Sequence, residues 1–222
     1  MKPLLSRTED SSTLQDLGRA SFQIVHDLKN QLNGLKLYAT FLKKRLEKSE
    51  RPDDEQETIV KLIAGLDRAA TDLSTIVQYG REIELKKQSG FDVHKALRGI
   101  CSSLNESESI AVCESDATSL TGEFDPTKLT DALRWISAVA LKHRGNSKDG
   151  GVITISVRPG GNETNEALVE WSGLSDLDHD PFRSFAGSDE IRMSLAKKIV
   201  EAHGGSATHT SNSLIVALPL SE

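Results

Sequence analysis

Hydrophobic residues recur at steps of three and four along residues 12–88 of this chain. Such spacing is typical of the apolar stripe of a long amphipathic helix. The obvious break is Arg51-Pro52-Asp53-Asp54, because a proline does not fit inside a regular helix. The pattern therefore predicts two helices of about 30 residues, each roughly 45 Å long, joined by a short turn.

The apolar stripe runs through both predicted helices and resembles a coiled-coil seam. Its members are Leu14, Leu17, Ser21, Ile24, Leu28, Leu32, Leu35, Ala39, Leu42 and Leu46, followed by Ile59, Leu62, Leu66, Ala69, Leu73, Ile76, Gly80 and Ile83. One helical hairpin cannot cover both apolar faces by itself. We therefore expect two copies of the hairpin to pair into a four-helix bundle across a two-fold axis.

The pattern changes near Gly90, where short strand-like and helix-like segments begin to alternate. It predicts helices at 94–104, 125–143 and 189–203, the second of which opens with the capping pair Asp125-Pro126. It predicts strands at 91–93, 109–113, 152–157, 167–171 and 214–220. Helices combined with largely antiparallel strands indicate an α+β fold. We expect residues 91–222 to form a layered α/β sandwich domain after the 12–88 hairpin.

Composition and charge narrow the class of partner. The chain has 222 residues and a formal net charge of -6, and no basic stripe that would favour nucleic acid is visible. Its apolar runs are shorter than the roughly 18 residues of a membrane span, and the N-terminus lacks the apolar core of a signal peptide. We therefore expect a cytoplasmic protein with neither a nucleic-acid nor a membrane partner. Cys101 and Cys113 fit no metal-binding spacing and are interpreted as structural thiols.

Candidate chemistry is concentrated in the segment from Val25 to Leu32, which reads VHDLKNQL. On a helix with about 100° between residues, His26 points away from the apolar stripe and into solvent. The carboxylate of Asp27 can reach one imidazole nitrogen, which would fix the tautomer and leave the other nitrogen a better nucleophile. Asn30 lies one turn further on, where its amide can orient a phosphoryl oxygen. A solvated surface histidine would give the same local pattern, but its place on a long hairpin before an α+β domain favours phosphoryl capture.

A mixed polar and apolar surface is predicted on the same helical face as His26. It consists of Asn33, Leu37, Thr40, Phe41 and Lys44, which we call the docking patch. An exposed Leu and Phe on an otherwise polar face predict contact with a protein partner. The alternative is that the second helix or the C-terminal domain covers these two side chains.

The segment HDLKNQL resembles the phosphoacceptor box of sensor histidine kinases, in the variant with Asn four residues after the His. Gln31 departs from this box, since many kinases have Pro there. Residues 91–222 resemble the ATP-binding domain of these kinases more faintly. Together the resemblance spans most of the chain, and it allows the kinase nucleotide site to be compared residue by residue.

This chain matches the kinases' magnesium-binding helix at the spacing of Asp and Leu, which we call the frame, but it lacks the asparagines that bind the metal. Asp125, Leu129 and Leu133 fit the frame, whereas the two asparagines of this box fall at Trp135 and Val139. Neither side chain offers an oxygen to a hard cation. The resemblance therefore implies that this chain binds no magnesium of its own.

The adenine and phosphate boxes are altered as well. The aspartate that grips adenine falls at Trp171, which we expect to be a core aromatic like Trp135. The glycines of the phosphate box fall at Glu190 and Arg192. A carboxylate at Glu190 would repel phosphate at a helix start that otherwise favours anions. We therefore expect no nucleotide cofactor.

The protein thus resembles the histidine phosphotransferases of sporulation and cell-cycle phosphorelays, which look like histidine kinases that have lost ATP binding. In this interpretation His26 is the nucleophile, Asp27 orients it, and Asn30 and Lys29 position the phosphoryl group. The partners are response-regulator receiver domains and a second copy of the chain, and magnesium comes with the receiver. Three alternatives remain: an active sensor histidine kinase with atypical ATP boxes, a receiver-domain phosphatase that relies on Asn30, and a scaffold that only binds a receiver.

Overall fold

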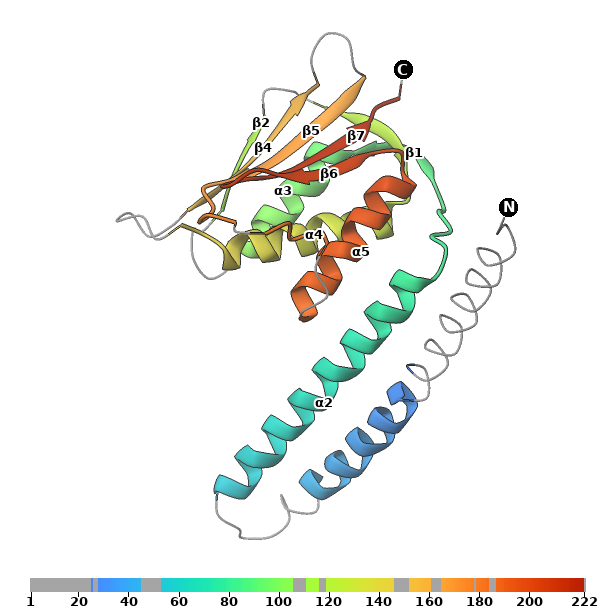
Figure 1. The fold of residues 1–222 in the computed structure, drawn as a ribbon, viewed down its shortest axis with the longest axis vertical. Helices are drawn as coiled ribbons and strands as arrows, with labels where there is room; N and C mark the ends of the chain where they lie inside the picture. The colour runs from blue at the N-terminus through green and yellow to red at the C-terminus, as the bar shows by residue number, and fades with distance from the viewer. Residues whose placement is uncertain are drawn as a thin grey trace, which may run out of the picture. The chain divides into compact units, whose positions relative to one another are not determined.

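The computed structural model describes residues 25, 28–44, 53–105, 111–115, 119–145, 152–160, 165–177, 179–183 and 187–221. His26, Asp27 and the predicted turn at Pro52 lie outside these described residues. The chain divides into two compact units, Met1–Glu82 and Ile83–Glu222 (Figure 1). Each unit is described by itself below.

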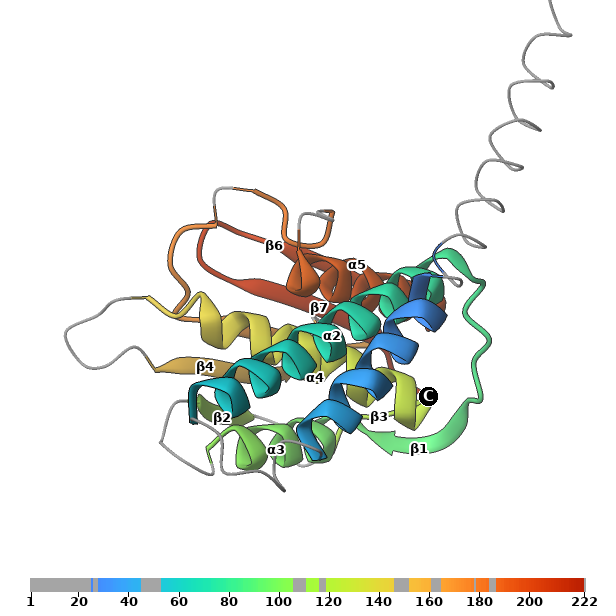
Figure 2. The same cartoon turned by 90° about the horizontal axis from the view of Figure 1, so that it is seen from below.

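The first unit contains two long helices that lie side by side (Figures 1 and 2). They are a helix over residues 28–44 and α2 (Asp53–Gly80). Lys36 on the first helix forms an ion pair with Asp67 on α2, with 2.5 Å between Nζ and Oδ1. Ala39, one turn further on, is 3% exposed. The line of residues through Leu32, Lys36 and Ala39 therefore faces α2.

The heptad-spaced leucines of the predicted seam lie beside this line. Leu28, Leu35 and Leu42 are 44%, 54% and 51% exposed. They recur every seven residues and so share one side of the helix, which lies next to the α2-facing line but is not covered by α2. The helical hairpin therefore leaves this leucine stripe uncovered within a single chain.

The helical region ends earlier than the predicted boundary at residue 88. α2 stops at Gly80, and residues 81–87 continue without regular structure to β1. Glycine is a weak helix former and is favoured at helix ends. None of the helices in the described part of the chain combines the length and apolar character that a bilayer crossing needs.

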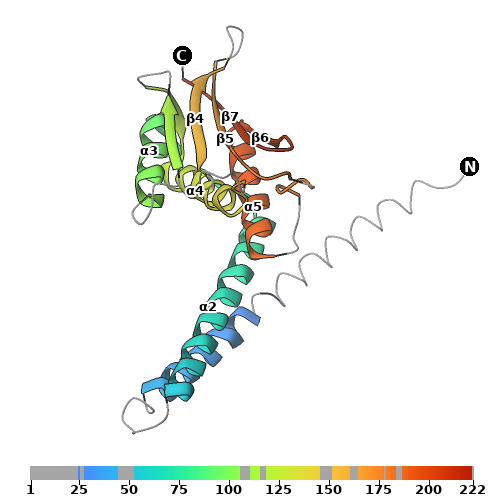
Figure 3. The same cartoon turned by 90° about the vertical axis from the view of Figure 1, so that its left-hand side faces the viewer.

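The second unit is a two-layer α+β sandwich, as the sequence predicts. Its elements are β1 (Gln88–Asp92), α3 (Val93–Leu104), β2 (Ala111–Ser115), β3 (Thr121–Phe124), α4 (Pro126–Lys142), β4 (Ile153–Pro159), β5 (Glu166–Ser172), α5 (Ser188–Ala202), β6 (Ser206–His209) and β7 (Leu214–Pro219). One five-stranded sheet has the order β2-β4-β5-β7-β6, and β1 pairs with β3 in a two-stranded sheet. Only the β2–β4 pair is parallel among these ladders. Helices α3, α4 and α5 cover one face of the large sheet (Figure 3).

The core lies between that helical layer and the sheet. Along β4, Ile153, Ile155 and Val157 are fully buried while the residues between them are half-buried. Leu129 and Leu133 of α4 are fully buried as well. Burial of each such side chain contributes about 1.5–3 kcal/mol. This core fixes α4 and α5, the two helices on which the kinase-like nucleotide site would be built.

Candidate functional site

The predicted catalytic residues fall at the start of the first helix. His26 and Asp27 lie outside the described residues, whereas Lys29 and Asn30 lie within the helix. Asn30 is exposed, and Lys29 is half-buried. Lys29 precedes Lys36 by seven residues, and it therefore lies on the line that faces α2. The helix thus separates Asn30 on the open side from Lys29 on the flank next to α2.

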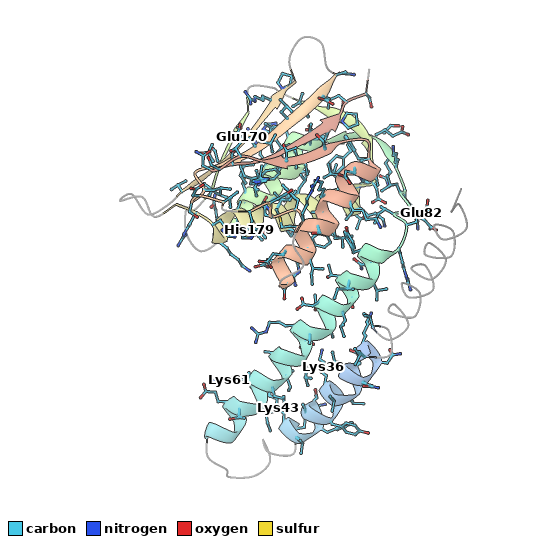
Figure 4. The ribbon with its side chains drawn as sticks, viewed as in Figure 1. Lys36, Lys43, Lys61, Glu82, Glu170 and His179 are labelled. Atoms are coloured by element: carbon cyan, nitrogen blue, oxygen red, sulfur yellow. The ribbon has the colours of Figure 1, made fainter. Side chains whose placement is uncertain are left out.

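The docking patch lies on the exposed side of this helix. Leu37 and Phe41 are 55% and 59% exposed, and Asn33 and Lys44 are exposed as well. Thr40 is half-buried, and its hydroxyl donates to the carbonyl oxygen of Lys36 at 2.8 Å. Lys36, labelled in Figure 4, belongs to the line that faces α2. α2 therefore leaves Leu37 and Phe41 uncovered.

The first helix exposes more apolar surface than one contact would cover. Six of its large hydrophobic side chains are 44–68% exposed, namely Leu28, Leu35, Leu37, Tyr38, Phe41 and Leu42. At about 100° per residue, the stripe of Leu28, Leu35 and Leu42 lies more than 90° around the helix from Leu37 and Phe41, and Tyr38 falls between them. Sequence reasoning missed Tyr38, although a helical wheel places it between the leucine stripe and the docking patch. Large exposed apolar surfaces mark interaction sites, so this helix offers two neighbouring contact surfaces.

The position at which the resemblance predicts the adenine-binding aspartate is filled by a core tryptophan. Trp171 is fully buried, and its indole N–H donates to the hydroxyl oxygen of Ser137 at 2.8 Å. Ser137 in turn donates to the carbonyl oxygen of Leu133, also at 2.8 Å. The prediction of a core aromatic is confirmed for Trp171, whereas Trp135 is half-buried. Sequence reasoning missed Ser137, because nothing local marks it as the partner of an indole 34 residues away.

A small cavity remains where the resemblance places magnesium and phosphate. Its volume is about 280 Å³, slightly below the roughly 300–1,000 Å³ that is usual for small-molecule sites. It is lined by Val139, His143, Asp176, Leu177, His179, Pro181, Asp189, Glu190 and Met193. Val139 and Met193, which are 5% and 0% exposed, give it an apolar floor. Among the residues described, no group of three or more His, Cys, Asp or Glu side chains is suited to a metal ion.

The start of α5 carries its own negative charge. Asp189 and Glu190 lie in the first turn of this helix, where the backbone N–H groups favour an anion. Asp189 forms ion pairs with Lys142 and with Arg192, the latter at 3.8 Å. Glu190 folds back over Gly187, so that a Cβ atom at Gly187 would lie 2.7 Å from its Oε2. A phosphate approaching this helix would meet the carboxylate of Glu190 and an Asp189 already paired with Lys142 and Arg192.

Asp125, the first residue of the kinase-like helix motif, is buried, and its hydrogen bonds connect neighbouring segments of the second unit. It caps α4, since its Oδ1 accepts from the N–H of Lys128 at 3.0 Å. Its own N–H donates to Nε2 of His203, also at 3.0 Å. His203 is 2% exposed at the end of α5. Burial lowers the pKa of His203, and the charges of Lys87 and Lys128 add to that effect, although the Ile199 carbonyl and Asp125 oppose it.

Comparison with known proteins gives the fold. No protein-family model matches this sequence, and no curated protein matches it either. The structure is similar to that of full-length ShkA in complex with AMPPNP, with a TM-score of 0.69 and 14% identity over 90% of this chain and 45% of ShkA. It is also similar to the histidine kinase AdeS of Acinetobacter baumannii, with a TM-score of 0.59 and 13% identity over 87% of this chain and 97% of that one. The chain has a histidine-kinase-like fold.

Within that fold, the chain spans about 45% of the length of ShkA. Because one fold can host different activities, the function has to be argued from the site. On this fold, Trp171 is buried, Val139 and Glu190 line a small cavity, and the helix after His26 exposes apolar side chains.

Proposed function

We propose that this chain is a phosphorelay histidine phosphotransferase. It accepts a phosphoryl group from the aspartyl phosphate of one receiver domain onto His26, and it passes the group to the aspartate of another. It works in the cytoplasm and without ATP. The observation that carries the proposal is Trp171, whose fully buried indole occupies the position expected for the adenine-binding aspartate on a histidine-kinase-like fold.

The chemistry needs little from this chain beyond positioning. An imidazole nitrogen of His26 attacks the phosphorus in line, the bond to the aspartyl oxygen breaks, and the aspartate leaves as a carboxylate. Asp27 holds the other imidazole nitrogen and stabilises the positive charge that develops on the ring. Asn30 orients a phosphoryl oxygen, and Lys29 adds positive charge nearby. Magnesium enters with the receiver domain, because carboxylate oxygens of the receiver suit that hard cation.

Two surfaces of the first helix serve two partners in this proposal. A second copy of the chain covers the stripe of Leu28, Leu35 and Leu42, which gives a homodimer built on a four-helix bundle. A receiver domain binds the docking patch beside His26. The support for this division is that both surfaces are exposed in one chain and lie on different sides of the same helix.

Phosphotransfer is tested by mixing the full chain with radiolabelled, phosphorylated receiver domains and following the label. We expect label on the chain within the time course, and none on a His26→Ala variant. Loss of label from the receiver with none on the chain, in a manner that requires Asn30, would support a phosphatase instead. Absence of both effects, with receiver binding retained, would support a scaffold.

Nucleotide use is tested by calorimetry with ATP and magnesium. We expect no binding at millimolar concentration and no autophosphorylation, because Trp171 occupies the position expected for the adenine-binding aspartate and the carboxylate of Glu190 would repel phosphate. An affinity in the micromolar range would overturn this expectation and restore the kinase interpretation.

A further inference from the structure

The segment between the two units is anchored at one residue before it enters the sheet. α2 ends at Gly80, and β1 begins at Gln88 (Figure 1). Residues 82–85 make no hydrogen bond or ion pair with other described residues. The backbone N–H of Lys86 then donates to Oδ2 of Asp125 at 2.9 Å, although the two residues are 39 positions apart.

Asp125 is well placed to hold this contact. Its side chain is 4% exposed, and its two oxygens accept from different donors: Oδ1 from Lys128 in α4 and Oδ2 from Lys86. Its own N–H donates to His203, whose Nδ1 lies 2.8 Å from the carbonyl oxygen of Ile199 in α5. Asp125 therefore joins the segment after α2 to both α4 and α5.

The charge of Asp125 supports the same role. Burial by itself would raise the pKa of this carboxyl, but the N–H donors of Lys128 and Lys86 outweigh that effect and lower it. The group therefore stays ionised at neutral pH. Hydrogen bonds to an ionised acceptor are roughly twice as strong as those between neutral groups.

We propose that Asp125 is a latch that fixes the end of the hinge between the two units at Lys86. With the latch closed, the free segment that follows α2 ends at Leu85, because Lys86 is held. With the latch open, the free segment extends to β1 at Gln88, which adds roughly 7 Å of reach at about 3.3–3.6 Å per residue. This role is independent of the proposed phosphotransfer.

Two pairs of variants separate the latch from ordinary stability. Asp125→Ser keeps a good cap for α4 but leaves only one oxygen for two donors. Its control is Asp92→Ser, because Asp92 caps α3 in the same way, at 3.1 Å from the N–H of Lys95, without touching the hinge. Lys86→Pro removes the N–H donor and leaves Asp125 intact. Its control is Lys86→Ala, which removes the side chain and keeps the donor.

The test measures amide hydrogen exchange along residues 82–87 and trypsin cleavage after Lys87, both on the full chain. In the wild type we expect the Lys86 amide to exchange at least about tenfold more slowly than those of Glu84 and Leu85, because only the Lys86 amide is bonded. Asp125→Ser should remove this protection. Cleavage after Lys87 should rise about fivefold or more in Asp125→Ser and Lys86→Pro, and should not change in either control.

Two results would overturn the latch. One is a Lys86 amide that exchanges as fast as its neighbours in the wild type. The other is cleavage after Lys87 that rises equally in Asp92→Ser, since that would reflect general destabilisation. If Asp125→Ser does not fold, the comparison of Lys86→Pro with Lys86→Ala decides, and equal cleavage in that pair rejects the proposal.

Discussion

The indole of Trp171 has the largest volume of the side chains that are fully buried in the described part of the chain. It packs between the sheet and α4, and its one polar atom is satisfied by Ser137. An aspartate in the same surroundings would be a buried charge without a counter-ion, which is strongly unfavourable. A tryptophan suits this position, where it contributes to the core.

The stability cost of altering Trp171 follows from this packing. Trp171→Ala should destabilise the second unit by about 3–5 kcal/mol, because it removes a large side chain from a closed core. Trp171→Phe should cost less, since it keeps a ring and loses mainly the hydrogen bond to Ser137, worth about 1 kcal/mol. Urea unfolding followed by circular dichroism measures both. Trp135→Ala is the matched control, and a Trp171→Ala cost no larger than the control's would show that the indole is not core.

His203 makes the stability of the second unit depend on pH. Its Nε2 accepts from the N–H of Asp125, so the folded state favours the neutral ring, and burial lowers the pKa. Below the ordinary histidine pKa of 6.5, the unfolded chain takes up a proton that the folded chain resists. The free energy of unfolding should therefore fall as pH decreases through that value, and the stability is fully present above it.

This dependence is measured by urea unfolding at pH 7.5 and pH 5.5. His203→Gln should be less stable overall but should flatten the difference between the two pH values, because glutamine can accept the same bond without titrating. His143→Gln, at an exposed residue, is the control and should keep the wild-type difference. A difference that survives in His203→Gln would assign the pH dependence to another group.

At the scale of elements, local signals identified the helices well. α4 begins after Asp125 and ends before His143, as the capping pair and the apolar period predict. β3 and β6 were not predicted, because each is only four residues long and mostly polar. β3 is held by its pairing with β1, from which α3 and β2 separate it in sequence. β6 is held by its pairing with β7, the strand that follows it. Strands of this kind depend on their partners more than on their own residues.

For the candidate site, the sequence predicted the buried Trp171 and the exposed positions of Leu37 and Phe41. The interpretation of Trp171, Val139 and Glu190 as defects in a nucleotide site stays a prediction. The wheel did not show which members of the apolar stripe meet the second helix, because an apolar stripe does not say which of its sides faces the partner helix. The bonds of Asp125 to Lys86 and to His203 span 39 and 78 residues. No local pattern encodes such contacts.

The leucine stripe leads to a prediction about assembly. Leu35 of this stripe and Leu62, a member of the predicted seam on α2, are 54% and 50% exposed in a single chain, so substituting them should disturb an interface more than the hairpin itself. Leu35→Asp with Leu62→Asp should convert the proposed dimer to monomers in light scattering, because each charge would be buried twice across the two-fold axis. Leu37→Asp is the control, since Leu37 is 55% exposed but lies on the docking patch. A double variant that remains dimeric would show that the stripe is not the interface.

At the scale of the whole molecule, the chain has a histidine-kinase-like fold, whereas the sequence resemblance predicts that its nucleotide site is altered. The elements that would form that site, α4, β5 and the start of α5, still pack around Trp171 and Met193. The second unit has a closed core of its own. In the proposed function the first helix binds the partner proteins, and the last prediction concerns its exposed surface.

Phe41 should be the main anchor of the docking patch. It is 59% exposed and lies on the same side of the helix as Leu37, so a receiver domain bound there would bury its ring. Loss of an aromatic anchor from the centre of an interface costs about 2 kcal/mol or more. Phe41→Ala should therefore slow phosphotransfer from a cognate receiver about tenfold or more, and should leave the proposed dimer and its melting temperature nearly unchanged.

Tyr38→Ala, which removes a 68% exposed aromatic beyond the edge of the patch, should slow transfer much less. His26→Ala should abolish transfer and keep receiver binding, because it removes the nucleophile and leaves the patch. Wild-type transfer by Phe41→Ala, or a collapse of its stability, would show that the receiver binds elsewhere.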